Sequence, residues 1–345
     1  MESLLHDIRY GYRMLVKNRA FTAVAVTAPA LGIGANSAIF SVVNSVVLRP
    51  LPYKDSDRLV AVWSNLRQAG LEKIVVSAPE LIDFRQQCVS FEELGASVME
   101  GVNVTGGQEA ERIRAALVSR NLLSMLGIKP ASGRTFEASE DQAGRSQVAI
   151  LSHSLWQRRF GGDPNIAGRT LTVNDKSREI VGVMPAGFRF PDPEVELYLP
   201  LVLTSDLLSE DNRGSHFLSV IGRLKPGVTI NQAQADINVV AERMSQDHSD
   251  TYRAGFGATV INLRDDVVGD VRTTLLILLG AVGFVLLIAC SNVANLLIAR
   301  AAARQKEVAL RMALGATRSR LVPQFLVESA LLSVFAGGLG LLLAL

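Results

Sequence analysis

The side chains of this sequence that are best suited to chemistry are its four histidines and two cysteines. Zinc ligands come at short fixed spacings such as C-x-x-C or H-E-x-x-H, and neither pattern occurs. The turn G-x-S-x-G, which presents the nucleophile of many hydrolases, is also absent. The six residues stand far apart, at His6, Cys88, His153, His216, His248 and Cys290. We therefore expect no catalytic residue, no metal site and no cofactor.

The sequence also lacks the loop with which many ATPases hold nucleotide phosphates. That loop has the pattern G-x-x-x-x-G-K-[ST], in which backbone N–H groups and the lysine contact the phosphates. No such run occurs in the chain. The protein is therefore not expected to be an enzyme that hydrolyses nucleotide by this route.

One segment places dense charge beside apolar sequence, RQKEVALRMALGATRSRLVPQFLVESALL, from Arg304 to Leu332. Its first part can form a short helix that Gly315 ends, and Thr317 can cap a second helix. A connection between two membrane helices could be a handful of residues, so a longer segment needs another explanation. The charge pattern alone leaves two explanations equally open: a basic membrane anchor, or a docking segment for another protein.

Long apolar runs on both sides must position this segment. The chain is 48% hydrophobic with a mean hydropathy of +0.25, which is high for a soluble domain of this size. Charged residues are missing from Phe21 to Leu48 and from Thr273 to Ala299, and each run exceeds the roughly 20 residues of a membrane-spanning helix. A cleaved signal peptide for the first run, or a buried helix of a soluble protein for the second, fits these lengths less well. A third run begins at Ser329, and we expect it to continue beyond Leu345.

Lysine and arginine gather at the membrane ends that we expect to face the cytoplasm. They are Arg9, Arg13, Lys17 and Arg19 before the first run, and Arg300, Arg304, Lys306, Arg311, Arg318 and Arg320 after the second. The N-terminus is thus expected in the cytoplasm and residues 49–272 outside it. The net charge of +2 conceals an uneven distribution, since residues 49–272 are net acidic and the remainder is net basic. Because the basic excess lies on the expected cytoplasmic side, we attribute it to topology and to the lipid bilayer, and we expect no nucleic-acid partner.

These signals divide the chain into six segments. They are a cytoplasmic interfacial helix at 1–20, transmembrane helix 1 at 21–48, an extracytoplasmic domain at 49–272, transmembrane helix 2 at 273–299, a cytoplasmic elbow at 300–322, and an incomplete transmembrane helix 3 at 323–345. Strand and helix signals alternate in 49–272 without the regular period of repeated βαβ units. The pattern predicts a large, two-lobed α+β domain joined to α-helical membrane spans.

Within the extracytoplasmic segment, two helix starts carry a specific signature. Ser77 with Glu80, and Thr229 with Gln232, match the capping box, in which two side chains satisfy each other's backbone N–H groups. We also expect Ser119 to open a short helix that ends at a glycine.

Small and polar residues mark possible contact faces on the membrane helices. Ala30, Gly34 and Ala38 recur at every fourth position, which favours close packing of helices. Asn292 and Asn295 place amide groups at membrane depth, where they need partners on a neighbouring helix. Ordinary helix contact is the favoured interpretation of all five residues, and a transport pathway is the alternative.

Long stretches of this sequence resemble a known family. The run EVALRMALGATRSRLVPQFLVESALL resembles the signature of FtsX-like permeases, and residues 31–53 and 148–192 resemble the MacB-type periplasmic core domain. The N-terminal DIRYGYRMLVKNRAFT is similar to orphan permeases of this superfamily that carry two such halves in one chain. The resemblance covers nearly the whole sequence. It implies an ABC transporter permease of the bacterial inner membrane, with four helices per half, of which this chain would hold two and part of a third.

The resemblance also implies how such a protein works. A separate cytoplasmic ABC ATPase would close on ATP, the elbow would pass that movement to the helices, and the outer domain would move in efflux or mechanotransmission. The expected ATPase-contacting residues are Glu307, Arg311, Gly315, Arg318 and Arg320. A dimer partner or second permease half, and an envelope partner, are further expectations. A membrane-anchored extracytoplasmic receptor or sensor without an ATPase remains the alternative, and lipoprotein release is another role within the permease class.

Overall fold

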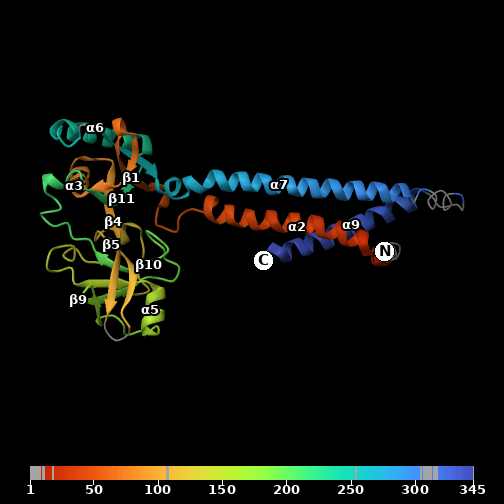
Figure 1. Ribbon diagram of the computed structural model, residues 1–345, viewed down its shortest axis with the longest axis horizontal. Helices are drawn as coiled ribbons and strands as arrows, with labels where there is room; N and C mark the ends of the chain where they lie inside the picture. Colours follow the sequence, from red (N-terminus) through yellow and green to blue (C-terminus); the bar gives the residue numbers. More distant parts are fainter. Residues whose placement is uncertain are drawn as a thin grey trace. The chain divides into compact units, whose positions relative to one another are not determined.

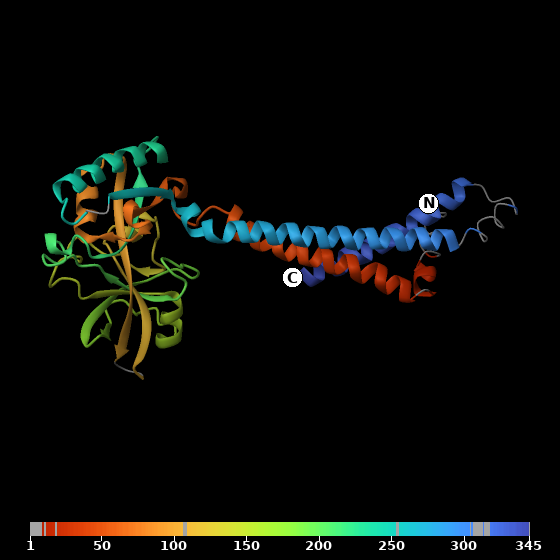
Figure 2. The ribbon, with the colours of Figure 1, turned by 45° about the horizontal axis from the view of Figure 1, so that its top comes forward.

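The chain forms two compact units in a computed structural model that describes residues 9, 12–17, 19–105, 109–252, 255–303, 305, 313 and 318–344. We call Met1–Arg49 together with Val268–Leu345 the helical unit, and Pro50–Val267 the α+β unit. Figures 1 and 2 show both units as ribbons. Each unit is described by itself below.

The helical unit is built from three long helices. α2 spans Arg19–Val43 and continues as a π-helical turn, η1, at Asn44–Leu48, while α7 spans Leu263–Ala303 and α9 spans Arg318–Ala344. In both views α2, α7 and α9 run alongside one another. Among the described residues, three stretches are long and apolar enough to cross a membrane: Arg19–Val43, Val271–Ala302 and Leu326–Ala344. Leu287, Ile288 and Val334 are each more than half exposed, as lipid-facing side chains would be.

Helix α7 begins earlier than the charge-free run suggested. The charge-free run begins at Thr273, whereas α7 begins at Leu263, so Val268, Gly269 and Asp270 lie inside the helix. The Asn262 side chain accepts a hydrogen bond from the Arg264 backbone N–H at 2.9 Å, as a helix-capping residue does. Asp265 and Asp266 follow in the first turn, where acidic side chains favour the helix dipole.

Twelve strands in the described part of the α+β unit form one twisted sheet. Its main order is β12-β1-β11-β4-β5-β10-β7-β9-β6, with β2, β3 and β8 paired beside this path. The strands are β1 Leu59–Leu66, β2 Leu71–Ile74, β3 Val76–Ser77, β4 Phe91–Thr105, β5 Glu111–Val118, β6 Ser132–Gly133, β7 Val148–Leu151, β8 Thr170–Val173, β9 Lys176–Val183, β10 Val195–Pro200, β11 His216–Leu224 and β12 Phe256–Asn262. Most neighbours are antiparallel, whereas β5 with β10 and β7 with β9 are parallel. The mixed order confirms the predicted α+β class.

Short helices pack on this sheet at both of its ends. They are α3 Ala78–Gln87, α4 Leu122–Met125, α5 His153–Phe160 and α6 Ile230–Asp247, with single 3-10 turns η2 Ser56–Arg58, η3 Arg67–Ala69 and η4 Glu210–Asn212. Figure 1 shows α3 and α6 on one lobe and α5 on the other. The 15-residue strand β4 joins the lobes, because its start pairs with β11 and its end pairs with β8.

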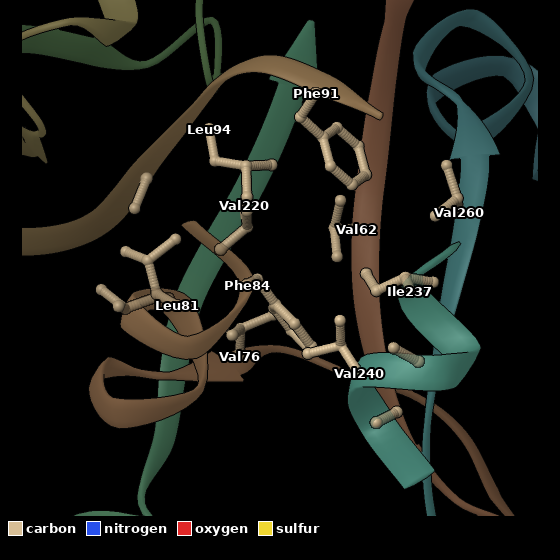
Figure 3. Packing of buried hydrophobic residues seen from close by; sticks show 14 of the residues in the cluster. Val62, Val76, Leu81, Phe84, Phe91, Leu94, Val220, Ile237, Val240 and Val260 are labelled. Carbon is tan, nitrogen blue, oxygen red and sulfur yellow. The ribbon is translucent and has the colours of Figure 1, made fainter. Parts of the chain in front are cut away.

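Each lobe has its own apolar core. In the first lobe, Phe84 of α3 and Ile237 and Val240 of α6 pack toward Val62 of β1 (Figure 3). A second cluster, which includes Leu155 of α5, fills the other lobe. A third cluster includes Leu122 of α4 and the fully buried Tyr198 of β10.

Two of the three helix starts predicted in this unit are confirmed, and the third is wrong. Both predicted capping boxes are confirmed, at Ser77 with Glu80 and at Thr229 with Gln232. The short helix α4 does not open at Ser119, however, and begins at Leu122. The Ser119 hydroxyl instead accepts from the Ala96 backbone N–H and donates to the Asn121 side chain, so it links the helix to β4.

Candidate functional site

Glycines allow α2 and α9 to pack closely in the helical unit. A Cβ atom added to Gly34 would lie 3.1 Å from the Gly340 carbonyl oxygen, and one added to Gly340 would lie 2.9 Å from the Ala30 carbonyl oxygen. Both distances are too short for a relaxed contact, so the two backbones meet because neither glycine has a side chain. Such small-residue contacts allow dispersion forces to hold helices together in lipid.

Helix α2 also contacts α7 on a second face. A Cβ atom on Gly32 would lie 2.9 Å from Leu286 Cδ1, and the Asn36 side-chain amide donates to the Val282 carbonyl oxygen at 3.1 Å. The same amide donates to the Gly32 carbonyl oxygen at 3.0 Å. Asn36 is therefore a polar link between helices, and sequence reasoning did not select it.

The ends of α7 and α9 that border the elbow are joined by an ion pair. Arg300 Nη2 of α7 lies 2.6 Å from Glu328 Oε1 of α9, with side-chain exposures of 14% and 10%. The Arg300 guanidinium carbon also lies 4.4 Å from the centre of the Phe21 ring on α2, a cation–π distance. Arg300, whose charge indicated only topology in the sequence, therefore links all three helices.

The five helix-packing residues predicted from the sequence differ in their exposure. Ala30 and Gly34 are buried in the α2 contacts, whereas Ala38, Asn292 and Asn295 are exposed in the described helical unit. A cavity of about 300 Å³ lies among the three helices, and neither asparagine lines it. Its wall is mostly apolar, with Ser329, Ser333 and Cys290 as the polar and thiol groups. A packing role for Ala38 and the two asparagines stays a prediction.

The predicted ATPase-contacting residues can be located only in part. Glu307, Arg311 and Gly315 lie outside the described residues. Arg318 and Arg320 form part of the first turn of α9, where the backbone is described. Both ends of the predicted elbow at 300–322 are helical, because α7 continues to Ala303 and α9 begins at Arg318. Contact of the elbow with an ATPase stays a prediction.

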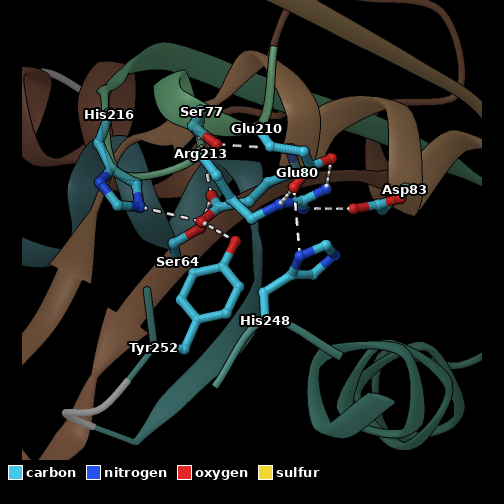
Figure 4. A network of polar contacts seen from close by, with 9 residues as sticks. All are labelled: Ser64, Ser77, Glu80, Asp83, Glu210, Arg213, His216, His248 and Tyr252. Carbon is cyan, nitrogen blue, oxygen red and sulfur yellow. Dashed lines mark hydrogen bonds and ion pairs between the residues drawn. The ribbon is translucent and has the colours of Figure 1, made fainter. Parts of the chain in front are cut away.

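The α+β unit contains a buried polar network centred on Glu80 of α3 (Figure 4). The Glu80 carboxylate is fully buried and accepts four hydrogen bonds. Its donors are the Ser64 hydroxyl at 2.8 Å, the Ser77 backbone N–H at 3.0 Å, the Tyr252 hydroxyl at 3.0 Å and His216 Nε2 at 3.0 Å. A buried carboxylate is stable only with such partners, so the network fixes α3 against β1, β3, β11 and the segment after α6.

A second set of ion pairs borders the first. Arg213 contacts the Asp83 carboxylate at 2.6 Å and the Glu210 carboxylate at 2.7 Å, and Glu210 lies 3.2 Å from His248. The Arg213 side chain is nearly buried, so these pairs hold the 210–213 turn against α3. The His216 pKa is raised because its ring hydrogen-bonds to the Glu80 carboxylate. The network therefore orders the fold around α3.

A polar cleft of about 400 Å³ lies beside α3, with Arg85, Arg120 and Asp141 in its wall. Cys88 also borders it, and burial raises the pKa of this thiol to about 12. A protonated thiol is a poor nucleophile, so covalent chemistry at Cys88 is not favoured. Among the described residues, no group of three or more His, Cys, Asp or Glu side chains is placed to hold a metal ion.

Comparison with known proteins identifies two matching regions. The MacB-like periplasmic core domain family matches residues 22–240, and the FtsX-like permease C-terminal family matches residues 279–345. The macrolide export ATP-binding/permease protein MacB of Hahella chejuensis is 23% identical over 98% of this chain and 50% of its own length. The uncharacterized ABC transporter permease YknZ of Bacillus subtilis is 24% identical over 71% of this chain and 60% of its own length. The chain thus spans about half the length of the curated relatives it matches.

Solved structures of similar segments come from the same group of proteins. The match to the periplasmic region of MacB from Actinobacillus actinomycetemcomitans covers 63% of this chain and 93% of that structure's chain. The sequence identity is 14% and the TM-score is 0.45. The match to the extracellular domain of the noncanonic ABC-type transporter YknZ from Gram-positive bacteria covers 59% of this chain and 99% of that structure's chain. The sequence identity is 14% and the TM-score is 0.41. The matched sequence regions show that this chain belongs to the MacB/FtsX-like permease family, with a MacB-like periplasmic core domain and an FtsX-like permease C-terminal region.

Proposed function

We propose that this permease couples closure of a separate cytoplasmic ABC ATPase to movement of its extracytoplasmic domain. The observation that carries the proposal is the continuity of α7, which runs without interruption from Leu263, next to β12, to Ala303, next to the elbow. A helix of 41 residues is about 60 Å long, roughly twice the thickness of the hydrocarbon core. Its hydrogen-bonded backbone resists bending, so a displacement at one end is transmitted along the helix.

The ion pair near the elbow supports the same mechanism. Arg300 and Glu328 lie on the two helices that the elbow connects, at a separation of 2.6 Å. A displacement of the elbow would therefore move α7 and α9 together. The ATPase-contacting residues in this proposal are Glu307, Arg311, Gly315, Arg318 and Arg320, and a second copy or permease half would complete the membrane part.

The cargo in this proposal need not cross between the helices of this chain. The cavity among α2, α7 and α9 measures only about 300 Å³ and is mostly apolar. Export of a molecule from the extracytoplasmic side, with help from an envelope partner, fits such a bundle better than a polar channel does. The Hahella chejuensis relative is, by its name, a macrolide exporter, which supports export as the role of this permease.

A receptor or sensor role is the second candidate function. The polar cleft beside α3 is large enough for a small ligand, since ligand pockets usually begin near 300 Å³. Its wall carries both signs of charge, from two arginines and from the carboxylates of Glu92, Glu93 and Asp141, which suits a polar molecule. An ATPase that co-purifies with the full-length permease would favour the first function over this one.

Charge reversal in the elbow tests the coupling proposal. The double variant Glu307→Lys with Arg311→Glu is expected to weaken binding of the ATPase at least about thirtyfold, because losing buried charge contacts costs on the order of 2 to 5 kcal/mol. The measurement is a quantitative pull-down of the ATPase with the full-length permease from membranes. Arg9→Glu is the matched control, since it also changes cytoplasmic charge but lies outside the elbow. Equal losses in both variants would show that the elbow acts only as a basic anchor.

The proposed orientation is tested by thiol labelling. In a background with Cys88→Ala and Cys290→Ala, we expect Asp175→Cys to react with an impermeant maleimide on intact cells, because Asp175 lies in the exposed turn between β8 and β9. Ala302→Cys, near the C-terminal end of α7, should react only after the cells are opened. Labelling of Ala302→Cys on intact cells would reverse the orientation.

A further inference from the structure

An apolar groove of about 420 Å³ lies in the α+β unit, apart from the Glu80 network and the polar cleft. Its walls are the segments 51–53 and 185–191, together with Ile128, Leu263 and Val267. Tyr53 and Phe190 meet edge to face, with ring centres 6.0 Å apart. The buried Tyr198 hydroxyl donates to the Phe190 carbonyl oxygen at 2.9 Å, which holds this wall in place. The groove is therefore a formed feature of the fold with aromatic and aliphatic walls.

The charge at the groove is carried by a single side chain. Arg189 is exposed and is the only lining residue with an ionised group at neutral pH, since burial raises the pKa of the Tyr53 hydroxyl above its already high ordinary value. No carboxylate among the described residues lies within ion-pair distance of Arg189. The arrangement suits a molecule with an apolar chain and one anionic head group.

The chain path keeps this groove close to the membrane surface. Val267 in its wall precedes Val271, where the apolar span of α7 begins, by four residues. Four residues of even fully extended chain reach only about 14 Å. The polar head-group layer is itself several ångströms thick, and tyrosine is enriched there. The wall at Val267 therefore lies within reach of lipid molecules whatever the angle between the domain and the helices.

We propose that this groove binds an acyl chain of an anionic phospholipid from the extracytoplasmic leaflet, with the lipid phosphate at Arg189. The apolar walls exclude water from the acyl chain, as the bilayer interior does. The guanidinium donates to the phosphate oxygens, a pairing for which its planar fork is well suited. The α+β domain would thus bind the membrane surface through a lipid, in addition to its chain connections to the membrane helices.

Photo-crosslinking of the full chain in lipid nanodiscs tests this site. The probe is phosphatidylglycerol with a diazirine on one acyl chain, and the crosslinked peptides are identified by mass spectrometry. We expect crosslinks on residues 51–53 and 185–191 in addition to the membrane helices. Val267→Glu should reduce groove labelling several-fold, because it places a charge in the apolar wall, and Val267 is 62% exposed, so the fold should tolerate the change.

Arg189→Gln separates the head-group contact from general apolar binding. Groove labelling by phosphatidylglycerol should fall about fivefold, the effect of one basic side chain on an anionic lipid. Arg243→Gln, an exposed arginine on α6 outside the groove, is the matched control and should change nothing. Crosslinks confined to the membrane helices, or equal labelling of the two glutamine variants, would overturn the proposal. Groove labelling by a diazirine-bearing apolar peptide but not by the lipid would assign the site to peptide and overturn it as well.

Discussion

Replacing Glu328 by alanine is expected to speed amide hydrogen exchange in α9 about a hundredfold or more. The substitution removes the carboxylate that lies 2.6 Å from Arg300, while the arginine keeps its charge in a largely buried position. Breaking a buried ion pair from one side costs about 3 to 5 kcal/mol, and exchange of the affected helix rises with the population of its open form. The measurement is hydrogen exchange of the full chain in nanodiscs, read by mass spectrometry on peptides of α7 and α9.

Two further variants show whether the pair itself is responsible. The exchanged pair, Arg300→Glu with Glu328→Arg, should recover much of the protection, because opposite charges again face each other. Ser333→Ala is the control on the same helix, since its hydroxyl donates to the Ser329 carbonyl one turn away, within α9. If Glu328→Ala and Ser333→Ala exchange alike, the ion pair does not hold α7 to α9. The coupling proposal would then lose its connection between the two helices at the elbow.

Features whose partners lie within a few residues of each other could be predicted from the sequence. The capping boxes at Ser77 and Thr229 place hydroxyl and acceptor three residues apart, so both partners are visible in one short window. The apolar spans are equally local, because length and absence of charge define them. Asn262 with Asp265 and Asp266 is also a local signal for the start of α7, but the charge-free run does not contain it, because these residues are polar or charged and precede the apolar span.

Contacts between distant residues could not be predicted in this way. Glu80 was selected only as a capping residue, and its partners Tyr252 and His216 are 172 and 136 positions away. The asparagines of the membrane helices also show that contacts between distant residues cannot be predicted from sequence position alone. Asn36, Asn292 and Asn295 look alike in the sequence, but only the rotation of each helix decides which amide meets a neighbour, and in the described helices it is Asn36.

The Glu80 network gives the α+β domain a stability that depends on pH. His216 Nε2 lies 3.0 Å from the Glu80 carboxylate and Nδ1 lies 3.0 Å from the Gly214 carbonyl oxygen. Both ring nitrogens thus face acceptors, an arrangement that only the doubly protonated ring satisfies fully. The pKa of His216 is accordingly raised by the hydrogen bond to Glu80. A raised pKa in the folded state stabilises the fold fully below the ordinary histidine pKa of about 6.5, and this contribution is lost as pH rises through the folded value.

The melting temperature of the domain is therefore expected to fall as pH rises from about 6 toward 8 and beyond. Trp63 and Trp156 are the two tryptophans of the chain and both lie in the α+β unit, so the intrinsic fluorescence of the full chain in detergent reports its unfolding. Glu80→Ala should lower the melting temperature on the order of 10 °C at pH 6, since it removes one side of a buried charge pair. Glu242→Ala, an exposed carboxylate on α6, is the matched control and should have little effect.

The histidine variants decide which group produces the pH dependence. His216→Asn should remove most of the fall in melting temperature between pH 6 and 8, because asparagine cannot gain or lose a proton in this range. His248→Asn tests the neighbouring histidine, which lies 3.2 Å from Glu210 and is 30% exposed, and it should leave most of the fall in place. An unchanged pH dependence in His216→Asn would assign the effect to another group. Glu80 would then stabilise the domain through its hydroxyl and backbone donors alone, independent of the charge on His216.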